Sequence, residues 1–224
     1  MLNLTGYNLT DYEMLSLQQE HNNFILSIVV AIITFISVFL IYLDYRNRKD
    51  KERAEKSIDI AKQFANHTLI NLSFIFDEFE LLELDKIINS VKYINFTDFD
   101  FEELNTLFSK ESIDQYIHIL NTYPGKDKLL ARITMTLNEL EYMCMNISTK
   151  VADEKYIYNS LHQQFLKSIS LLYFSISLSN TDEKDKYYTN IIQVFNIWKD
   201  KYVKACKKEK KFKKRLKSKI PKIN

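Results

Sequence analysis

Glycine and proline are scarce in this sequence, whose 224 residues hold only Gly6, Gly125, Pro124 and Pro221. Tight turns, β-hairpins and phosphate-binding loops draw on these two residue types. Isolated glycines therefore exclude nucleotide-binding and dinucleotide-binding loops. Because few residues interrupt the chain, the composition favours long helices.

Cysteine and histidine are also few, with two cysteines and four histidines that show no metal-ligand spacing. No histidine follows an arginine at the spacing found in helical ribonucleases, and no nucleophile elbow is present. We therefore assign no catalytic, metal-binding or cofactor-binding residue, and we expect no cofactor and no enzymatic activity. The alternative that stays open is a membrane-tethered enzyme such as a nuclease.

Charge is missing altogether from residues 24–43, "FILSIVVAIITFISVFLIYL". At about 1.5 Å per residue these twenty residues span roughly 30 Å, which is the hydrocarbon thickness of a bilayer. A core helix of a soluble domain would show a polar stripe, and a cleaved signal peptide would have a shorter apolar part preceded by positive charge. The segment therefore predicts a transmembrane helix.

Positive charge lies only on the C-terminal side of this segment, as expected for the cytoplasmic flank of a membrane span. Residues 1–23 contain no Lys or Arg. The basic residues that we expect at the membrane interface are Arg46, Arg48, Lys49, Lys51 and Arg53. The pattern predicts a single-pass protein of the cytoplasmic (inner) membrane, with its N-terminus outside and its C-terminus in the cytoplasm.

These features divide the chain into five parts. The predicted parts are a short extracytoplasmic segment (1–23), the transmembrane helix (24–43), a basic juxtamembrane linker (44–56), a helical cytoplasmic domain (57–200) and a basic tail (201–224). The fold class is all-α, with one N-terminal transmembrane helix followed by a bundle of five or six helices.

A long helix over residues 50–84 is expected to run out of the membrane. The sequence leaves open whether it is one helix from the bilayer or breaks near Asn66. Apolar residues recur along it every three or four positions, which predicts one buried face. That face consists of Ile58, Ala61, Phe64, Ala65 and Leu69. Two acidic runs, at 77–85 and 98–103, are interpreted as solvated helix faces.

The later helices carry recognisable start signals. Asp98 or Asp100 is expected to cap one helix, Ser109 or Ser112 the next, and Asp153 a third. Residues 127–149 form a strongly periodic helix after the Pro-Gly turn. Its predicted apolar face consists of Leu130, Ile133, Leu137, Leu140 and Cys144.

Asn138 and Glu141 are three residues apart on that helix and therefore share a face. A buried pair of this kind would hold a ligand or fix the register of neighbouring helices. We prefer the second interpretation and treat them as a polar helix-packing pair, because buried polar groups require partners.

The C-terminal tail is the most basic part of the chain. Phe212, Leu216 and Ile220 recur every four residues among lysines, which predicts a basic amphipathic helix. The expected partner is anionic lipid, and the residues assigned to it are Lys207, Lys208, Lys210, Lys211, Lys213, Lys214 and Arg215. Nucleic acid is a weaker rival, and an unstructured solubilising end is the third interpretation.

The segment "LNELEYMCMNISTKVADEKYIYNSLHQQFLKSISLLYF", followed by "YYTNIIQVFNIWK", resembles a family of bacterial single-pass membrane proteins with an all-helical cytoplasmic domain of unknown function. The resemblance covers residues 128–200. Its matching positions are Leu137, Asn138, Glu141, Asp153, Glu154, Tyr187, Tyr188 and Trp198. It implies a fold and a location but no activity.

We expect the cytoplasmic domain to act through a protein partner or through self-association at the membrane face. By analogy with small bacterial membrane proteins of this build, defence against phage is the expected setting. A membrane-disrupting effector that works by oligomerising is a further alternative.

Overall fold

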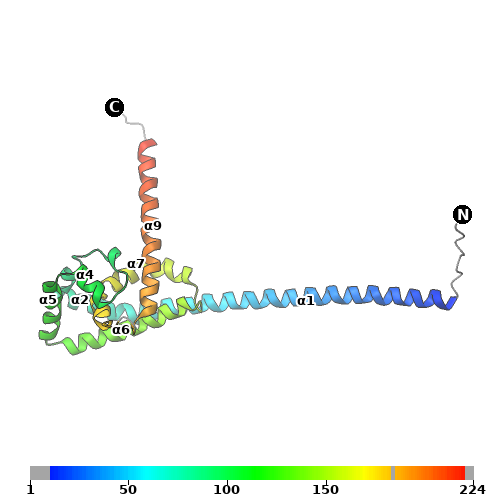
Figure 1. Cartoon of the computed structure of the whole chain (residues 1–224), viewed down its shortest axis with the longest axis horizontal. Helices are drawn as coiled ribbons and strands as arrows, with labels where there is room; N and C mark the ends of the chain where they lie inside the picture. The colour runs from blue at the N-terminus through cyan, green and yellow to red at the C-terminus, as the bar shows by residue number, and fades with distance from the viewer. Residues whose placement is uncertain (1–10, 183–184, 220–224) are drawn as a thin grey trace. The chain divides into compact units, whose positions relative to one another are not determined.

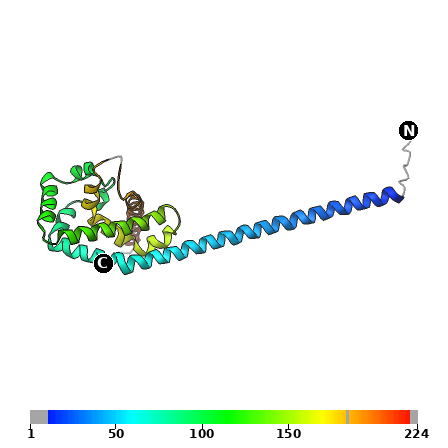
Figure 2. The same cartoon turned by 90° about the horizontal axis from the view of Figure 1, so that it is seen from below.

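A computed structural model describes residues 11–182 and 185–219, with side chains described for residues 19–182 and 185–213. Every regular element in this part of the chain is helical, which confirms the predicted all-α class. The chain divides into two compact units, residues 1–52 and 53–224. Figures 1 and 2 show the helices of both.

The first unit consists of most of one long helix, α1 (Asp11–Gln63). The apolar side chains from Phe24 to Tyr42 are exposed along it. Among the described residues, this is the one helix long and apolar enough to cross a membrane, by length and composition. The predicted juxtamembrane linker, residues 44–56, is part of the same helix.

The second unit is a helical bundle. Its helices are α2 (Leu69–Leu81), α3 (Leu84–Ile88), α4 (Phe101–Leu107), α5 (Lys110–Thr122), α6 (Lys126–Ser148), α7 (Glu154–Leu171), α8 (Tyr173–Ser179) and α9 (Thr189–Lys219). The end of α1 also belongs to this unit. Helix α6 packs against α2 and α9, and α7 packs against α9.

The bundle has more helices than the five or six predicted, because the chain breaks at two positions that were not recognised. Glu83 has a φ of 58° and separates α2 from α3. Apolar periodicity predicts one helix that begins at Asp153 and ends near Ser179. In the structure, Leu172 divides this segment into α7 and α8. Near Asn66 the chain does not leave the helix but passes through a π-helical turn, Phe64–Thr68, and continues into α2.

The caps explain where several helices begin. Asp100 accepts a hydrogen bond from the amide of Glu103 at the start of α4, and Ser109 accepts one from Ser112 at the start of α5. Asp153 accepts one from Lys155 at the start of α7. The sequence had left Asp98 and Ser112 as alternatives, and the structure selects Asp100 and Ser109.

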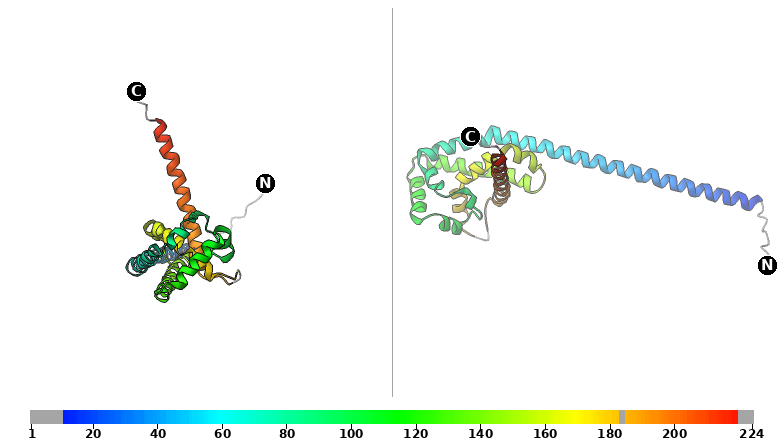
Figure 3. Two further views of the ribbon diagram at one scale, coloured as in Figure 1. Left: turned by 90° about the vertical axis from the view of Figure 1, so that its left-hand side faces the viewer. Right: turned by 90° about the horizontal axis from the view of Figure 1, so that it is seen from above.

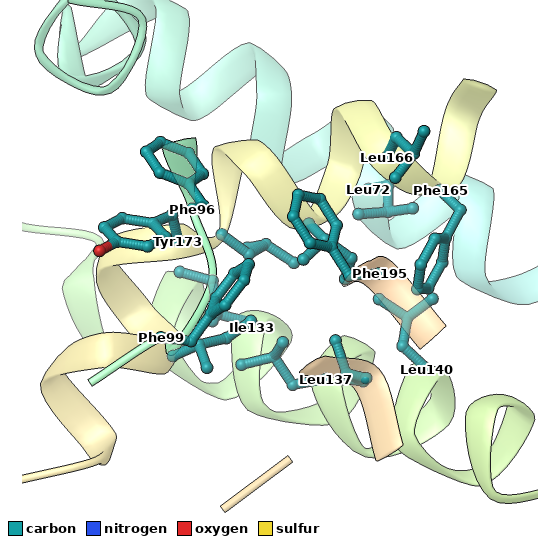
Figure 4. Packing of buried hydrophobic residues seen from close by; sticks show 14 of the residues in the cluster. Leu72, Phe96, Phe99, Ile133, Leu137, Leu140, Phe165, Leu166, Tyr173 and Phe195 are labelled. Atoms are coloured by element: carbon teal, nitrogen blue, oxygen red, sulfur yellow. The ribbon is translucent and has the colours of Figure 1, made fainter. Parts of the chain in front are cut away.

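Aromatic side chains fill the core of the bundle (Figure 4). The rings of Phe96 and Tyr173 stack at 3.8 Å, and Phe99 meets Phe195 edge-on at 5.0 Å. Large aromatic residues bury 150–250 Å² each, so they dominate the energetics of a small core. These contacts fix the 93–100 segment against α8 and α9.

The apolar face predicted for residues 58–69 is right at Phe64, which is buried, and wrong at Ile58 and Ala65, which are exposed. Ile58 is 51% exposed, whereas Ser57 and Ile60 are buried. The Ser57 hydroxyl accepts a hydrogen bond from the amide of Asp153 at 2.7 Å and donates one to the carbonyl of Arg53. Ser57 is polar, yet it lies on the buried face because both hydrogen bonds satisfy its hydroxyl. A search for periodic apolar residues therefore misses this position.

The predicted face of α6 needs one correction. Ile133, Leu137, Leu140 and Cys144 are buried as expected, but Leu130 is 41% exposed and Leu129 is buried in its place. Leu129 lies four residues before Ile133 and continues the same stripe.

Helix α9 is a single helix of 31 residues. Its first half is packed against α6 and α7, and its second half stands away from the other helices of the bundle (Figures 1 and 3). The boundary predicted at residue 200 between domain and tail therefore falls inside one continuous helix.

Candidate functional site

The carboxylate of Glu141 binds the N-terminus of α9. Its Oε1 accepts hydrogen bonds from the backbone amide of Asn190 at 3.1 Å and from the side-chain amide of Asn190 at 2.7 Å. Its Oε2 accepts one from the amide of Ile191 at 2.9 Å. Helix N-termini carry unpaired amides and a positive end of the helix dipole. Glu141 thus caps α9 from the neighbouring helix α6.

The predicted pairing of Asn138 with Glu141 is wrong. Asn138 is exposed, and Glu141 is directed at α9. The expectation that Glu141 fixes helix packing fits its contacts, but its partner is Asn190. Sequence spacing along α6 identifies neighbours on that helix only, and no signal in the sequence marks a partner 49 residues away.

Replacing Glu141 by alanine should lower the free energy of unfolding by about 1–3 kcal/mol, because charge-assisted bonds to backbone amides are lost. Glu141→Gln should lose less, since it keeps an acceptor oxygen. Urea denaturation of the detergent-solubilised full chain, followed by far-UV circular dichroism, measures both. Asn138→Ala serves as the control and should change the value by no more than about 0.5 kcal/mol. Equal losses at positions 138 and 141 would contradict the capping role.

A row of exposed side chains runs along the solvent side of α6. Met135, Asn138, Tyr142 and Met145 follow one another at spacings of three and four, so they share one face. Met135 is 46% exposed, Tyr142 44% and Met145 41%. We call these four residues the α6 stripe. Beside it, the ammonium of Lys56 lies 5.6 Å from the centre of the Tyr142 ring and donates a hydrogen bond to its hydroxyl, which lowers the pKa of Tyr142.

Glu103 organises the 97–99 segment and is not the solvated acid that the sequence suggested. Its carboxylate accepts hydrogen bonds from the amides of Thr97, Asp98 and Phe99 at 2.6, 3.0 and 2.7 Å. The hydroxyls of Thr97 and Tyr173 add two more, at 2.7 and 3.1 Å. Phe99 has a φ of 53°, a left-handed conformation that is strained for a bulky residue. The carboxylate therefore stabilises a turn that carries two core rings.

Asp100 continues this network. Its carboxylate accepts a hydrogen bond from Lys186 at 2.7 Å as well as from the amide of Glu103. Burial alone would raise the pKa of Asp100, but these hydrogen bonds outweigh it and hold the pKa below its usual value. Such a carboxylate stabilises the fold above its unfolded-state pKa, and the stabilisation is lost as pH falls through the folded-state pKa.

Lys199 is a buried cation on α9. It is 4% exposed, and its ammonium donates hydrogen bonds to the carbonyl of Phe96 and to Asn196 Oδ1. Desolvation lowers its pKa. Asn196 in turn donates to the carbonyl of Thr97 at 2.8 Å. The two side chains tie the 96–97 backbone to α9, so this lysine has a structural use for its charge.

Trp198 joins α9 to α7. Its indole is fully buried between Tyr158 and Phe165, with ring centres 5.4 and 4.9 Å away. Its Nε1 donates a hydrogen bond to Glu154 at 3.1 Å, and Glu154 also binds Lys201 at 2.7 Å. Position 154 and position 198 both belong to the residues of the family resemblance. The structure brings them together as a packing contact.

Four of the five predicted interface residues lie in the first unit. Arg46, Arg48, Lys49 and Lys51 are exposed on α1, where Arg48 pairs with Asp44 at 3.0 Å. Arg53 belongs to the second unit and is half-buried. The assignment of these five residues to the membrane interface stays a prediction.

The predicted lipid-binding tail begins on the free half of α9. The side chains of Lys207, Lys208, Lys210, Lys211 and Lys213 are exposed. Lys214 and Arg215 fall within the helix, but their side chains lie outside the described residues. Ile220 lies outside them altogether.

A cavity of about 400 Å³ opens between the 88–96 segment and α7. Its lining is mainly apolar, from Ile88, Tyr93, Phe96 and Leu171, with Lys92 and Lys167 also on its wall. Within the described ranges, no three His, Cys, Asp or Glu side chains gather as metal ligands would. The cavity can accept an apolar group.

Comparison of the chain with protein-family models, curated proteins and solved structures finds no match. The resemblance over residues 128–200 therefore stays a prediction.

Proposed function

We propose that this chain is a single-pass membrane protein whose cytoplasmic bundle acts through a protein partner or through a second copy of itself. The apolar part of α1 supports the membrane attachment, since its fifteen large exposed apolar side chains would be unfavourable in water by about 25 cal/mol per Å². The basic residues after it support an orientation with the bundle in the cytoplasm.

The observation that carries the association is the α6 stripe. The other side of α6 packs into the core of the bundle, with Leu137, Leu140 and Cys144 almost fully buried. The stripe displays two methionines and a tyrosine on a helix that this packing holds rigid. Tyr and Met are enriched in protein interfaces, and flexible methionine side chains fit varied partners. A partner helix or a second α6 would cover this face.

Such a module would serve in sensing or defence, with association as its output. Defence against phage enters only by analogy with small bacterial membrane proteins of this architecture. Association of membrane-held copies needs only a weak contact, because tethering raises their effective concentration.

Charging the stripe tests this function. We expect Met135→Asp combined with Met145→Asp to remove most of the cross-linked species that the full chain forms in native membranes, because a partner would then have to bury two carboxylates. Mass spectrometry of the cross-linked bands distinguishes a second copy from another protein.

The matched control places two aspartates at exposed apolar positions elsewhere in the bundle. Leu81 and Tyr156 are 73% and 60% exposed. Leu81→Asp with Tyr156→Asp should leave the cross-linking pattern unchanged. If the two double variants behave alike, or if the wild type forms no cross-linked species, the stripe is not an interface.

A further inference from the structure

The free half of α9 is a helix without tertiary support. We call residues 204–219 the α9 arm. From Lys204 to Lys213 every described side chain is exposed except Cys206, which is half-buried. Figure 3 shows the arm leaving the bundle as a straight continuation of the packed half of α9. An isolated helix of this length is marginal in water even with good helix formers.

The charge on the arm is almost entirely positive. Its 16 residues include ten lysines and arginines and a single acid, Glu209. That acid is already used within the helix, where it pairs with Lys213 at 2.6 Å, one turn further along. Lysines spaced this closely repel one another and weaken the helix further. The arm therefore needs negative charge supplied from outside.

The arm also carries an apolar group that the bundle does not use. Phe212 is 61% exposed in the middle of the lysines. A helix with lysines around an exposed ring is the composition of segments that lie in the headgroup region of a bilayer, where lysines meet lipid phosphates and the ring enters the acyl boundary. A duplex nucleic acid would satisfy the lysines but not the ring.

We propose that the α9 arm binds the surface of a bilayer through anionic lipid headgroups. The proposal rests on the proposed membrane attachment, which brings such a surface within reach of the bundle. Because α9 is one unbroken helix, the bound arm is mechanically joined to the contacts of Trp198 and Lys199 and to the Glu141 cap at its start. Lipid binding would in this way reach the core of the bundle and the helix that carries the α6 stripe.

Hydrogen exchange on the full chain in nanodiscs tests the proposal. One set of discs contains only phosphatidylcholine, and the other contains 40% phosphatidylglycerol. We expect the amides of residues 204–213 to be at least tenfold better protected in the anionic discs at low salt. The added protection should disappear at 0.5 M NaCl, because salt screens the attraction.

Two triple variants that remove the same charge show whether the added protection depends on the arm or on the bundle. Lys207, Lys210 and Lys211 all changed to Gln should remove most of the added protection, since each lysine near an anionic surface contributes a factor of about five. Lys92, Lys110 and Lys155 changed to Gln remove the same charge from the bundle and should leave it intact. Changing all six of Lys207, Lys208, Lys210, Lys211, Lys213 and Lys214 to Gln should abolish it.

Several outcomes would overturn the proposal. These are equal protection in neutral discs, no protection in either disc, an equal effect of the two triple variants, or stronger protection by added RNA than by anionic lipid. Failure of the membrane attachment is seen separately, because the chain would then not co-elute with the discs.

Discussion

Replacing Val29, Ile33 and Ile36 by arginine should move the protein from the membrane fraction to the soluble or aggregated fraction. Each arginine at the centre of a span opposes insertion by about 2.5–3.5 kcal/mol on the biological insertion scale, whereas each apolar residue favours it by about 0.3–0.6 kcal/mol. Three arginines therefore outweigh the favourable contribution of the twenty residues. Alkaline carbonate extraction of membranes, followed by detection of the protein, measures the change.

The same three positions changed to leucine provide the control and should leave the protein in the membrane. Protease added to intact cells then reports the orientation of this control and of the wild type. We expect the C-terminus to be protected, because the basic flank of α1 remains on the cytoplasmic side. Membrane retention of the triple arginine variant would show that α1 is not what holds the protein there.

Sequence patterns predicted where the helices lie more accurately than they predicted the contacts between helices. The candidate span, the helical class and the caps Asp100, Ser109 and Asp153 follow from local chemistry, which a sequence displays directly. Local rules missed the break at Leu172 because residues 154–179 read as one continuous periodic run. They also missed part of the buried face at the end of α1, where Ser57 lies.

Long-range polar contacts could not be predicted at all. Glu141 was selected for its spacing from Asn138, yet it binds Asn190. Glu103 was read as part of a solvated acidic run, yet it holds three consecutive backbone amides. Both carboxylates satisfy backbone groups that would otherwise lack partners. Only a folded chain shows which amides those are.

Helix α9 is the element on which these contacts meet. Glu141 holds its first turn, Trp198 and Lys199 fix its middle, and its basic end leaves the bundle. The side chains that bury against α6 and α7 recur every three or four residues, namely Ile191, Val194, Phe195 and Trp198. Any change that loosens this helix should affect the whole bundle.

Trp198→Ala should destabilise the bundle by about 3–5 kcal/mol, because truncating a buried tryptophan leaves a large cavity. The indole is fully buried against Tyr158 and Phe165, and its loss also removes the hydrogen bond to Glu154. For a domain of this size, the melting temperature should fall by roughly 6–20 °C. Far-UV circular dichroism of the full chain in detergent measures the transition without using tryptophan fluorescence.

Two further variants separate the causes of that loss. Trp198→Phe keeps much of the ring volume and loses the hydrogen bond, while Glu154 retains its pair with Lys201, so the loss should be clearly smaller than for alanine. Ile197 is the neighbour on the same helix and is 43% exposed. Ile197→Ala should cost clearly less than Trp198→Ala, because a side chain that is 43% exposed gives up less buried area. If Trp198→Ala and Ile197→Ala have the same melting temperature, the contact between α7 and α9 does not hold the bundle together. A large loss of stability at Trp198 alone would show that this residue holds α9 in the bundle. Along α9, Trp198 lies between the Glu141 cap and the arm.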